Sequence, residues 1–254
     1  MIRFLHVTKR LGGSVVLDEM DLEIRKGETF FIVGASGAGK SVTLKHMVRL
    51  LTPDSGSVFL DGLEVSDASG RDLEDVRARV GYLFQGGALL QWLTVGDNVG
   101  LPLREHTQKS DEEIDHMARE KLKLVGLENA FDKFPSELSG GMRKRGALAR
   151  AIVTQPEIIL YDEPTSGLDP VTSRTIDRLI DGLRSELGVT SVVVTHDLHS
   201  ALSIGSRIAM LHKGRLVEVA TPEGFIGSGS PAVRSFLESQ FITRKGVWEQ
   251  HNAP

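Results

Sequence analysis

Gly34-Ala35-Ser36-Gly37-Ala38-Gly39-Lys40-Ser41 is the stretch of this sequence that limits its fold most tightly. It matches G-x-x-x-x-G-K-[ST], a phosphate-binding turn that connects a strand to a helix. The apolar run Thr29–Val33 before it predicts a buried strand, and a helix is expected over about residues 41–51. A glycine-rich turn without a ligand is the alternative, but the matching context on both sides favours a phosphate site.

Each residue type in this turn has a physical purpose. Gly37 and Gly39 allow the backbone N–H groups to turn inward around phosphate. The N-terminus of the following helix adds a dipole that favours an anion. We expect Lys40 to reach the β- and γ-phosphates of ATP and the Ser41 hydroxyl to ligate Mg²⁺.

Strands and helices alternate along most of the chain, which predicts an α/β fold with a mainly parallel sheet covered on both faces. The N-terminal part differs, because it reads as short strands separated by turns. Besides Thr29–Val33, the expected strands cover residues 2–7, 15–17, 20–24, 58–60, 80–84, 158–161, 191–194, 208–211 and 215–219, the last two forming a hairpin.

The middle of the chain is expected to be helical. Ser110 to Glu113 form a capping box before a helix that runs toward Val125. A second helix is expected over about residues 141–153 and ends before Pro156. This stretch is therefore interpreted as a helical insertion into the α/β fold.

Two carboxylates end the apolar strand predicted at residues 158–161. Ligands collect at the carboxyl ends of strands in open parallel sheets. Asp162 is therefore placed to hold Mg²⁺ through its water shell, and Glu163 to orient and deprotonate an attacking water. Alone, such a pair reads as solvated acids at a strand end, but the phosphate-binding turn upstream favours hydrolysis.

Composition limits the partners, the metal sites and the cellular compartment expected for this chain. The net charge of −4 indicates no general attraction to nucleic acid, and the absence of cysteine excludes disulfides and thiolate metal sites. Neither a signal peptide nor an apolar run of about 20 residues is found, so the chain is expected to be cytosolic and to reach a membrane only through a partner.

Leu138-Ser139-Gly140-Gly141 precedes the second inserted helix, and Asp162-Glu163-Pro164 follows soon after. With the phosphate-binding turn, these motifs resemble the nucleotide-binding subunits of ABC transporters from residue 2 to about residue 219. The resemblance implies a P-loop, RecA-like core (residues 1–85 and 155–220) with an N-terminal antiparallel β subdomain. It also implies a helical subdomain over about residues 86–154, followed by a helix and tail over 221–254.

Three further residues take their roles from the same resemblance. Gln85 is similar to the family's Q-loop glutamine, which touches Mg²⁺ or water, although a plain strand-end amide is the alternative. Asp169, in Ser166-Gly-Leu-Asp169, is similar to the D-loop aspartate beside the nucleotide. His196 is similar to the H-loop histidine that contacts the γ-phosphate, and a metal pair with His199 is disfavoured because no other ligands surround it.

The family architecture implies two copies of the chain. Ser139, Gly140 and Gly141 open a helix, which makes them an anion site. The resemblance implies that they cap the γ-phosphate bound by the opposite subunit, so that ATP joins a head-to-tail pair. The basic residues 143–145 that follow are interpreted as a solvated helix face.

Two positions depart from the family pattern. Leu11 stands where ABC ATPases usually carry an aromatic residue stacked on adenine, and Met142 stands where many relatives have glutamine. The first departure predicts weak base stacking.

The segment after Gln85 is apolar and includes Trp92, which is typical of a partner site; local core packing is the alternative. Residues 83–89, 98–108 and 137–142 closely resemble the ATPase family of the Mla system, which moves phospholipid between the inner and outer membranes. This resemblance implies a membrane permease, an MCE-domain lipid-binding protein, a STAS-type subunit and a place at the cytoplasmic face of the inner membrane.

The sequence leaves three alternative functions. They are transport of another cargo, a soluble ABC ATPase acting on nucleic acid or ribosomes, and a P-loop phosphotransferase. The single cassette and the lack of a basic stripe disfavour the second, and residues 138–141 disfavour the third.

The C-terminal tail carries Val233, Phe236, Leu237 and Phe241, which are expected to share one face of a helix. Trp248 lies further on. Residues 241–248 are expected to reach a second ATPase subunit, because tryptophan is enriched among interface anchors.

Overall fold

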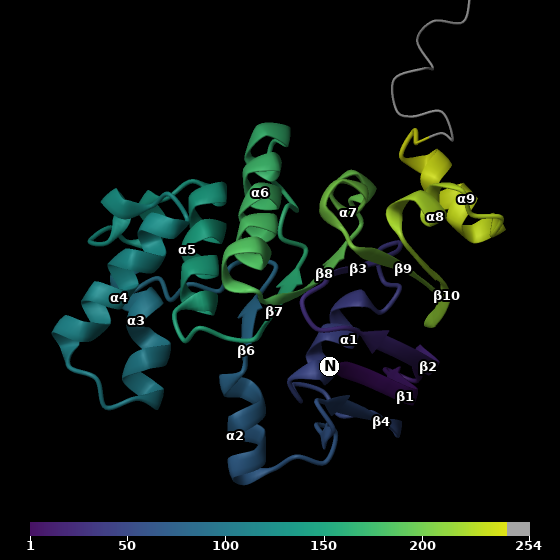
Figure 1. Ribbon diagram of the computed structural model, residues 1–254, viewed down its shortest axis with the longest axis horizontal. Coiled ribbons are helices and arrows are strands. Elements are labelled where there is room, and N and C mark those ends of the chain that lie inside the picture. The colour runs from purple at the N-terminus through teal and green to yellow at the C-terminus, as the bar shows by residue number, and fades with distance from the viewer. Residues whose placement is uncertain (243–254) are drawn as a thin grey trace, which may run out of the picture. The chain divides into compact units, whose positions relative to one another are not determined.

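The computed structural model describes residues 1–242 (Figure 1). The chain divides into two compact units. Within the described part of the chain, the first unit comprises Met1–Ala68 and residues 194–242, and the second comprises Ser69–Val193. Among the described residues, no helix is long and apolar enough to cross a membrane.

The first unit begins with an antiparallel sheet in the order β2-β1-β4-β5. Its strands are β1 (Ile2–Leu11), β2 (Ser14–Ile24), β4 (Ser55–Leu60) and β5 (Leu63–Glu64). The expectation of two short strands over residues 15–24 was wrong. Glu19 adopts a φ of 45°, and β2 continues through this irregularity because both of its halves pair with the single long strand β1.

The other strands of the first unit follow the order β10-β9-β3. Strand β3 (Thr29–Val33) is fully buried and runs parallel to β9 (Arg207–His212), which forms the predicted hairpin with β10 (Arg215–Ala220). Helix α1 (Lys40–Met47) is shorter than expected, because the chain turns at Arg49, whose φ is 52°.

The second unit contains strands in the order β8-β7-β6. β6 (Val80–Leu83) and β7 (Ile158–Asp162) are parallel, with Leu83 opposite Tyr161, and β8 spans Thr190–Thr195. Helices α2 (Gly70–Ala78) and α6 (Pro170–Leu187) belong to the same unit, and Ile176 and Ile180 on α6 are buried. β7 is buried along its whole length, as expected for a parallel strand.

Three helices of the second unit pack together: α3 (Val95–His106), α4 (Asp111–Leu124) and α5 (Gly140–Ile152) (Figure 1). The sequence did not predict α3, because two glycines and Pro102 lie in it. Its glycines serve close packing. A Cβ on Gly96 would lie 2.6 Å from the Phe131 ring, and one on Gly100 would lie 2.7 Å from Ile114 Cγ2.

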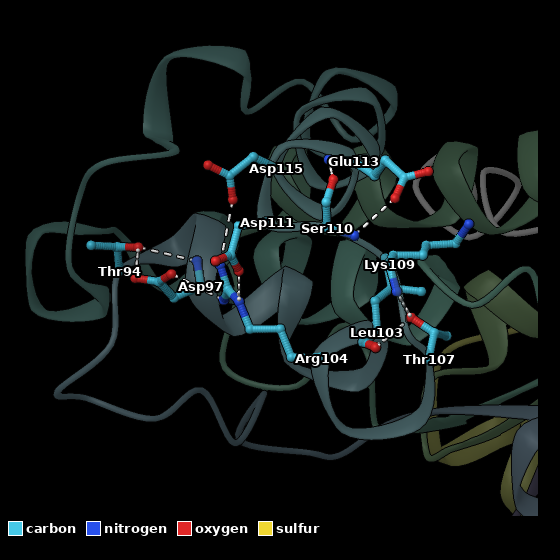
Figure 2. Close-up of polar contacts among 10 residues, drawn as sticks. All are labelled: Thr94, Asp97, Leu103, Arg104, Thr107, Lys109, Ser110, Asp111, Glu113 and Asp115. Carbon is cyan, nitrogen blue, oxygen red and sulfur yellow. Dashed lines mark hydrogen bonds and ion pairs between the residues drawn. The ribbon is translucent and has the colours of Figure 1, made fainter.

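The connection between α3 and α4 is held by polar contacts (Figure 2). The predicted capping box is confirmed: Ser110 Oγ accepts from the Glu113 N–H, and the Glu113 carboxylate accepts from the Ser110 N–H. Arg104 on α3 forms ion pairs with Asp97, Asp111 and Asp115, at 3.1, 3.5 and 3.4 Å. The pairs with Asp111 and Asp115 join α3 to α4, whereas Asp97 lies on α3 itself.

The C-terminal part of the first unit contains α7 (Leu198–Ile204), α8 (Pro222–Ile226) and α9 (Pro231–Ser239). Val233 and Leu237 on α9 are buried, as a single helix face predicts. The expectation that Phe241 shares this face was wrong, because the helix has ended and Phe241 has a φ of 57° and is 75% exposed. Trp248 and most of the proposed anchor lie outside the described residues.

Candidate nucleotide-binding and hydrolysis site

The phosphate-binding turn connects β3 to α1 in the first unit. Lys40 is 6% exposed, and its Nζ donates hydrogen bonds to the carbonyl oxygens of Gly34 at 2.9 Å and Ala35 at 3.1 Å. The turn therefore curls around the ammonium group. Residues 35–37 are exposed at the tip of the turn, where their backbone groups are accessible to a ligand.

Packing explains why glycine stands at the two ends of this turn. A Cβ on Gly34 would lie 2.3 Å from the carbonyl oxygen of Leu211. Gly39 has a φ of 105°, and a Cβ there would lie 2.8 Å from the carbonyl oxygen of Val16. The close approach of β2 and β9 thus sets the shape of the turn. Ser41 follows Lys40 in the first turn of α1 and is partly exposed.

The predicted acid pair lies at the carboxyl end of β7 in the second unit. Asp162 is 5% exposed and Glu163 is 8% exposed. The Tyr82 hydroxyl donates to Asp162 Oδ2 at 3.4 Å. Burial, and then the negative charge of Asp162, raise the pKa of Tyr82 far above its ordinary value, so the phenol stays protonated and keeps its donor role.

Gln85 leaves the neighbouring strand at the same edge of the sheet. β6 and β7 run parallel in register, so the residues that follow Leu83 and Tyr161 emerge side by side. Gln85 itself is exposed, and Tyr82 stacks on Phe84 with ring centroids 4.1 Å apart. The structure therefore brings Gln85 and the acid pair to the same edge of the sheet.

The segment Ser139–Gly141 opens α5. Ser139 is its N-cap, and the serine Oγ accepts from the Met142 N–H at 3.3 Å. Ser139 and Gly140 are exposed. A Cβ on Gly141 would lie 2.4 Å from Thr172 Cγ2, so the missing side chain lets the start of α5 approach the start of α6.

Asp169 is the N-cap of α6. Its Oδ1 accepts from the N–H groups of Val171 and Thr172, both at 3.0 Å. The hydrogen bond from the Thr172 side chain, followed by that from the Thr172 backbone, lowers the pKa of the Asp169 carboxyl. This carboxylate therefore has a structural role in addition to the nucleotide contact that the sequence resemblance implies.

His196 follows β8 and is exposed, in the first unit with the phosphate-binding turn. Gln240, just after α9, donates from Nε2 to the His196 carbonyl oxygen at 2.5 Å and accepts from the Leu198 N–H at 3.1 Å. The C-terminal helix is thus tied to the segment that carries His196. Sequence reasoning missed Gln240.

The expectation of a solvated basic face at residues 143–145 was wrong for Lys144, whereas Arg143 and Arg145 are half-exposed. Lys144 is 7% exposed and donates from Nζ to the carbonyl oxygens of Glu163 at 3.1 Å and Ser166 at 2.6 Å. Arg143 donates to Leu138, and Arg145 donates to Val125 and Gly126. The sequence did contain an indication that Lys144 is buried, because it has the i, i+4, i+7 spacing of a buried helix face with Leu148 and Ala151.

Two further residues that the sequence reasoning missed shape the apolar segment after Gln85. Asn98 is fully buried, accepts from the Leu90 N–H and donates to the carbonyls of Leu90, Leu93 and Thr94. Arg150 donates to the carbonyls of Gly87 and Ala88. The segment therefore has a defined shape. Leu89 is buried in it, whereas Trp92 is 74% exposed.

The residues expected to hold Mg²⁺ fit that ion by their chemistry. Ser41, Gln85 and Asp162 offer hydroxyl, amide and carboxylate oxygens, which are the donors that Mg²⁺ prefers. The buried side of Asp162 is oriented by Tyr82. In residues 1–242, no group of three or more His, Cys, Asp or Glu could hold a metal ion. Protein-bound Mg²⁺ usually keeps several waters and also binds substrate phosphates.

Comparison with known proteins identifies the class. The ABC transporter family profile matches residues 17–166, and the chain belongs to this family. It is an ABC-type ATPase with the predicted P-loop fold, including the antiparallel β and helical subdomains.

Individual relatives extend the comparison. The chain is 42% identical to the probable ribonucleotide transport ATP-binding protein mkl of Mycobacterium leprae, over 96% of this chain and 70% of that protein. It is 40% identical to the intermembrane phospholipid transport system ATP-binding protein MlaF of Escherichia coli, over 89% of this chain and 84% of that protein. The ATP-binding cassette MJ0796, solved as a dimer with ADP and Pi, superimposes with a TM-score of 0.81 at 36% identity and covers 87% of this chain and 99% of that one.

Proposed function

We propose that the chain is the ATPase subunit of a phospholipid transporter, and that it works as a homodimer at the cytoplasmic face of the inner membrane. The buried Asp162–Glu163 pair, at the same sheet edge as Gln85, is the observation that carries the hydrolytic chemistry. The identity with MlaF across most of both chains supports the cargo.

The proposed chemistry assigns one task to each residue. Lys40 and the N–H groups of residues 34–41 bind the β- and γ-phosphates, and Ser41, Gln85 and Asp162 hold Mg²⁺, which neutralises phosphate charge when bound. Glu163 orients the attacking water and accepts its proton, while His196 contacts the γ-phosphate. Water attack on phosphorus releases ADP and inorganic phosphate.

A homodimer explains the exposed start of α5. Ser139 and Gly140 present an uncovered helix N-terminus, which attracts an anion. In the proposed dimer, Ser139, Gly140 and Gly141 cap the γ-phosphate bound to residues 34–41 of the partner, and Asp169 lies near the same nucleotide. The dimeric MJ0796 cassette supports this assembly.

The permease is proposed to dock on the apolar segment after Gln85. Trp92 is exposed there, and the backbone around it is held by Asn98, so a rigid apolar surface is available to a partner. An MCE-domain protein and a STAS-type subunit are proposed as further partners, following the resemblance to the Mla family. No nucleic acid is included.

The cargo is tested by purifying the complete complex from membranes and reconstituting it in phospholipid vesicles. ATP-dependent transfer of a fluorescent phospholipid is expected, and the same complex carrying Glu163→Gln is expected to show none. Mass spectrometry of the complex is expected to find bound phospholipid.

Ribonucleotide transport is the second candidate, because mkl is named for that cargo. ATP-dependent uptake of labelled ribonucleotide without lipid transfer would replace the phospholipid proposal. Purification without any membrane protein would favour a soluble ABC ATPase instead.

A further inference from the structure

Helix α5 is joined to the loop that carries Glu163 by one buried ammonium group. Lys144 lies five residues after the N-cap Ser139, and its Nζ donates to Glu163 O at 3.1 Å and Ser166 O at 2.6 Å. All these residues belong to the second unit. A single side chain thus connects the start of α5 to both ends of the turn over residues 163–166.

This arrangement has an energetic cost. Lys144 is 7% exposed, and burying an ammonium group is unfavourable unless it is compensated. Burial lowers the pKa of Lys144 to about 8, against an opposing attraction from Glu163. An apolar side chain of the same length would avoid this desolvation cost. The presence of a lysine therefore indicates that its hydrogen bonds to the Glu163 and Ser166 carbonyls are important.

Lys144 binds the backbone of Glu163, the residue proposed to act as the general base. Glu163 has a φ of 50°, which is uncommon for a residue with a side chain. Its carbonyl also accepts from the Ser166 N–H at 3.2 Å, which closes the turn. The direction of the Glu163 carboxylate depends on the conformation of this turn. Lys144 holds that conformation from the neighbouring helix α5.

A second contact couples the same two elements. Gly141 approaches Thr172 so closely that a Cβ would lie 2.4 Å from Thr172 Cγ2, and Thr172 also donates to the Asp169 carboxylate. A displacement of the start of α5 therefore acts on the segment from Glu163 to Asp169 at two points: through Lys144 and through Thr172.

We propose that Lys144 is a positioning residue that transmits occupation of Ser139–Gly141 by the partner's nucleotide to Glu163 of its own subunit. The inference rests on the proposed homodimer, in which Ser139–Gly141 serve one nucleotide and Glu163 of the same chain serves the other. Within each subunit, Lys144 thereby links the segment that serves one ATP site to the residue that serves the other ATP site.

The test replaces Lys144 with methionine, which keeps the length and removes both donors. We expect kcat for ATP to fall about 10- to 100-fold, since small misplacement of a catalytic group has effects of this size. Binding of fluorescent ATP is expected to stay unchanged, because residues 34–41 are untouched. The ATP dependence of turnover is expected to change from sigmoidal to hyperbolic as the sites lose coupling.

Arg145→Met is the matched control. Arg145 lies on the same helix and also donates to backbone carbonyls, but those of Val125 and Gly126 rather than the catalytic loop. It is expected to keep kcat within about threefold of wild type and to keep the sigmoidal curve. Lys144→Arg retains the charge and the donors, and is expected to restore most of the turnover.

Several outcomes would overturn the inference. These are wild-type kcat in Lys144→Met, a hyperbolic curve in the wild type, or equal losses in Lys144→Met and Arg145→Met that follow their thermal stability. If Lys144→Met does not fold, Lys144→Gln is measured against the same criteria. Failure of the proposed function is distinct, because wild-type protein would then hydrolyse no ATP or Glu163→Gln would hydrolyse it normally.

Discussion

At the scale of single residues, Glu163 carries the most specific chemical expectation. Glu163→Gln preserves the shape of the side chain but removes the base, so kcat is expected to fall about 10²–10⁴-fold while ATP binding is kept. ATP is then expected to hold the dimer together, which light scattering would detect as doubled mass. Glu186→Gln, on the exposed end of α6, is the control and is expected to leave turnover unchanged.

Leu11 carries an expectation about base selectivity. It ends β1 and is 41% exposed, and as an aliphatic side chain it offers no ring for adenine to stack on. GTP is therefore expected to support turnover at a rate close to that of ATP. Leu11→Tyr is expected to tighten ATP binding by about 1–3 kcal/mol, the range for base–aromatic stacking. A strong ATP preference in the wild type would mean that another residue supplies the stack.

The stability of the folded chain is expected to depend on pH through His46. This residue is buried on α1 and its Nδ1 bonds to the Val42 carbonyl at 2.7 Å; burial lowers its pKa below the ordinary 6.5. As pH falls, the unfolded chain therefore binds the proton before the folded chain does, and stability decreases. The melting temperature is expected to fall from about pH 7.5 to about pH 5.5, and to fall less in His46→Leu.

The control for this measurement is His116→Ala, because His116 is exposed on α4. It is expected to keep the wild-type pH dependence. An equal fall in melting temperature in His46→Leu and the wild type would show that other groups cause the loss of stability at low pH.

At the scale of elements, the apolar segment after Gln85 depends on α3. Asn98→Leu removes four hydrogen bonds to that segment from a fully buried side chain. It is expected to lower the free energy of unfolding by about 3 kcal/mol, because buried polar groups are left without partners. Chymotrypsin is expected to cut faster at Trp92 in the folded variant.

Asn129→Leu is the matched control, because Asn129 is exposed in the short helix Glu128–Ala130. It is expected to change neither urea unfolding nor cleavage. Unchanged stability in Asn98→Leu would show that the segment holds its shape without the amide.

At the scale of the whole molecule, the proposed composite sites are tested by mixing two variants. Ser139→Arg places a bulky charge at the start of α5 and is expected to abolish hydrolysis while ATP still binds. Lys40→Ala is expected to weaken nucleotide binding in its own subunit, because it removes the charge expected between the phosphates. A mixed dimer is left with at most one competent site, so activity is expected to remain below half that of wild type. Full recovery in the mixture would contradict composite sites.

Local patterns along the chain were sufficient to predict much of the molecule. The phosphate-binding turn, the strand before Asp162 and the Ser110 capping box each depend on residues close together in sequence, and each was correctly placed. The α/β class followed from alternation of strands and helices. Such features are readable because backbone preferences and short-range hydrogen bonds act over a few residues.

Contacts between distant segments had to come from the folded chain. Helix α3 was hidden because its glycines disfavour a helix locally, and they are needed where Phe131 and Ile114 pack against it. Lys144 read as a solvated cation because the carbonyls that receive it lie 19 and 22 residues away. A buried polar group is stabilised by partners that the fold brings together, and one segment of sequence holds no record of where those partners will lie.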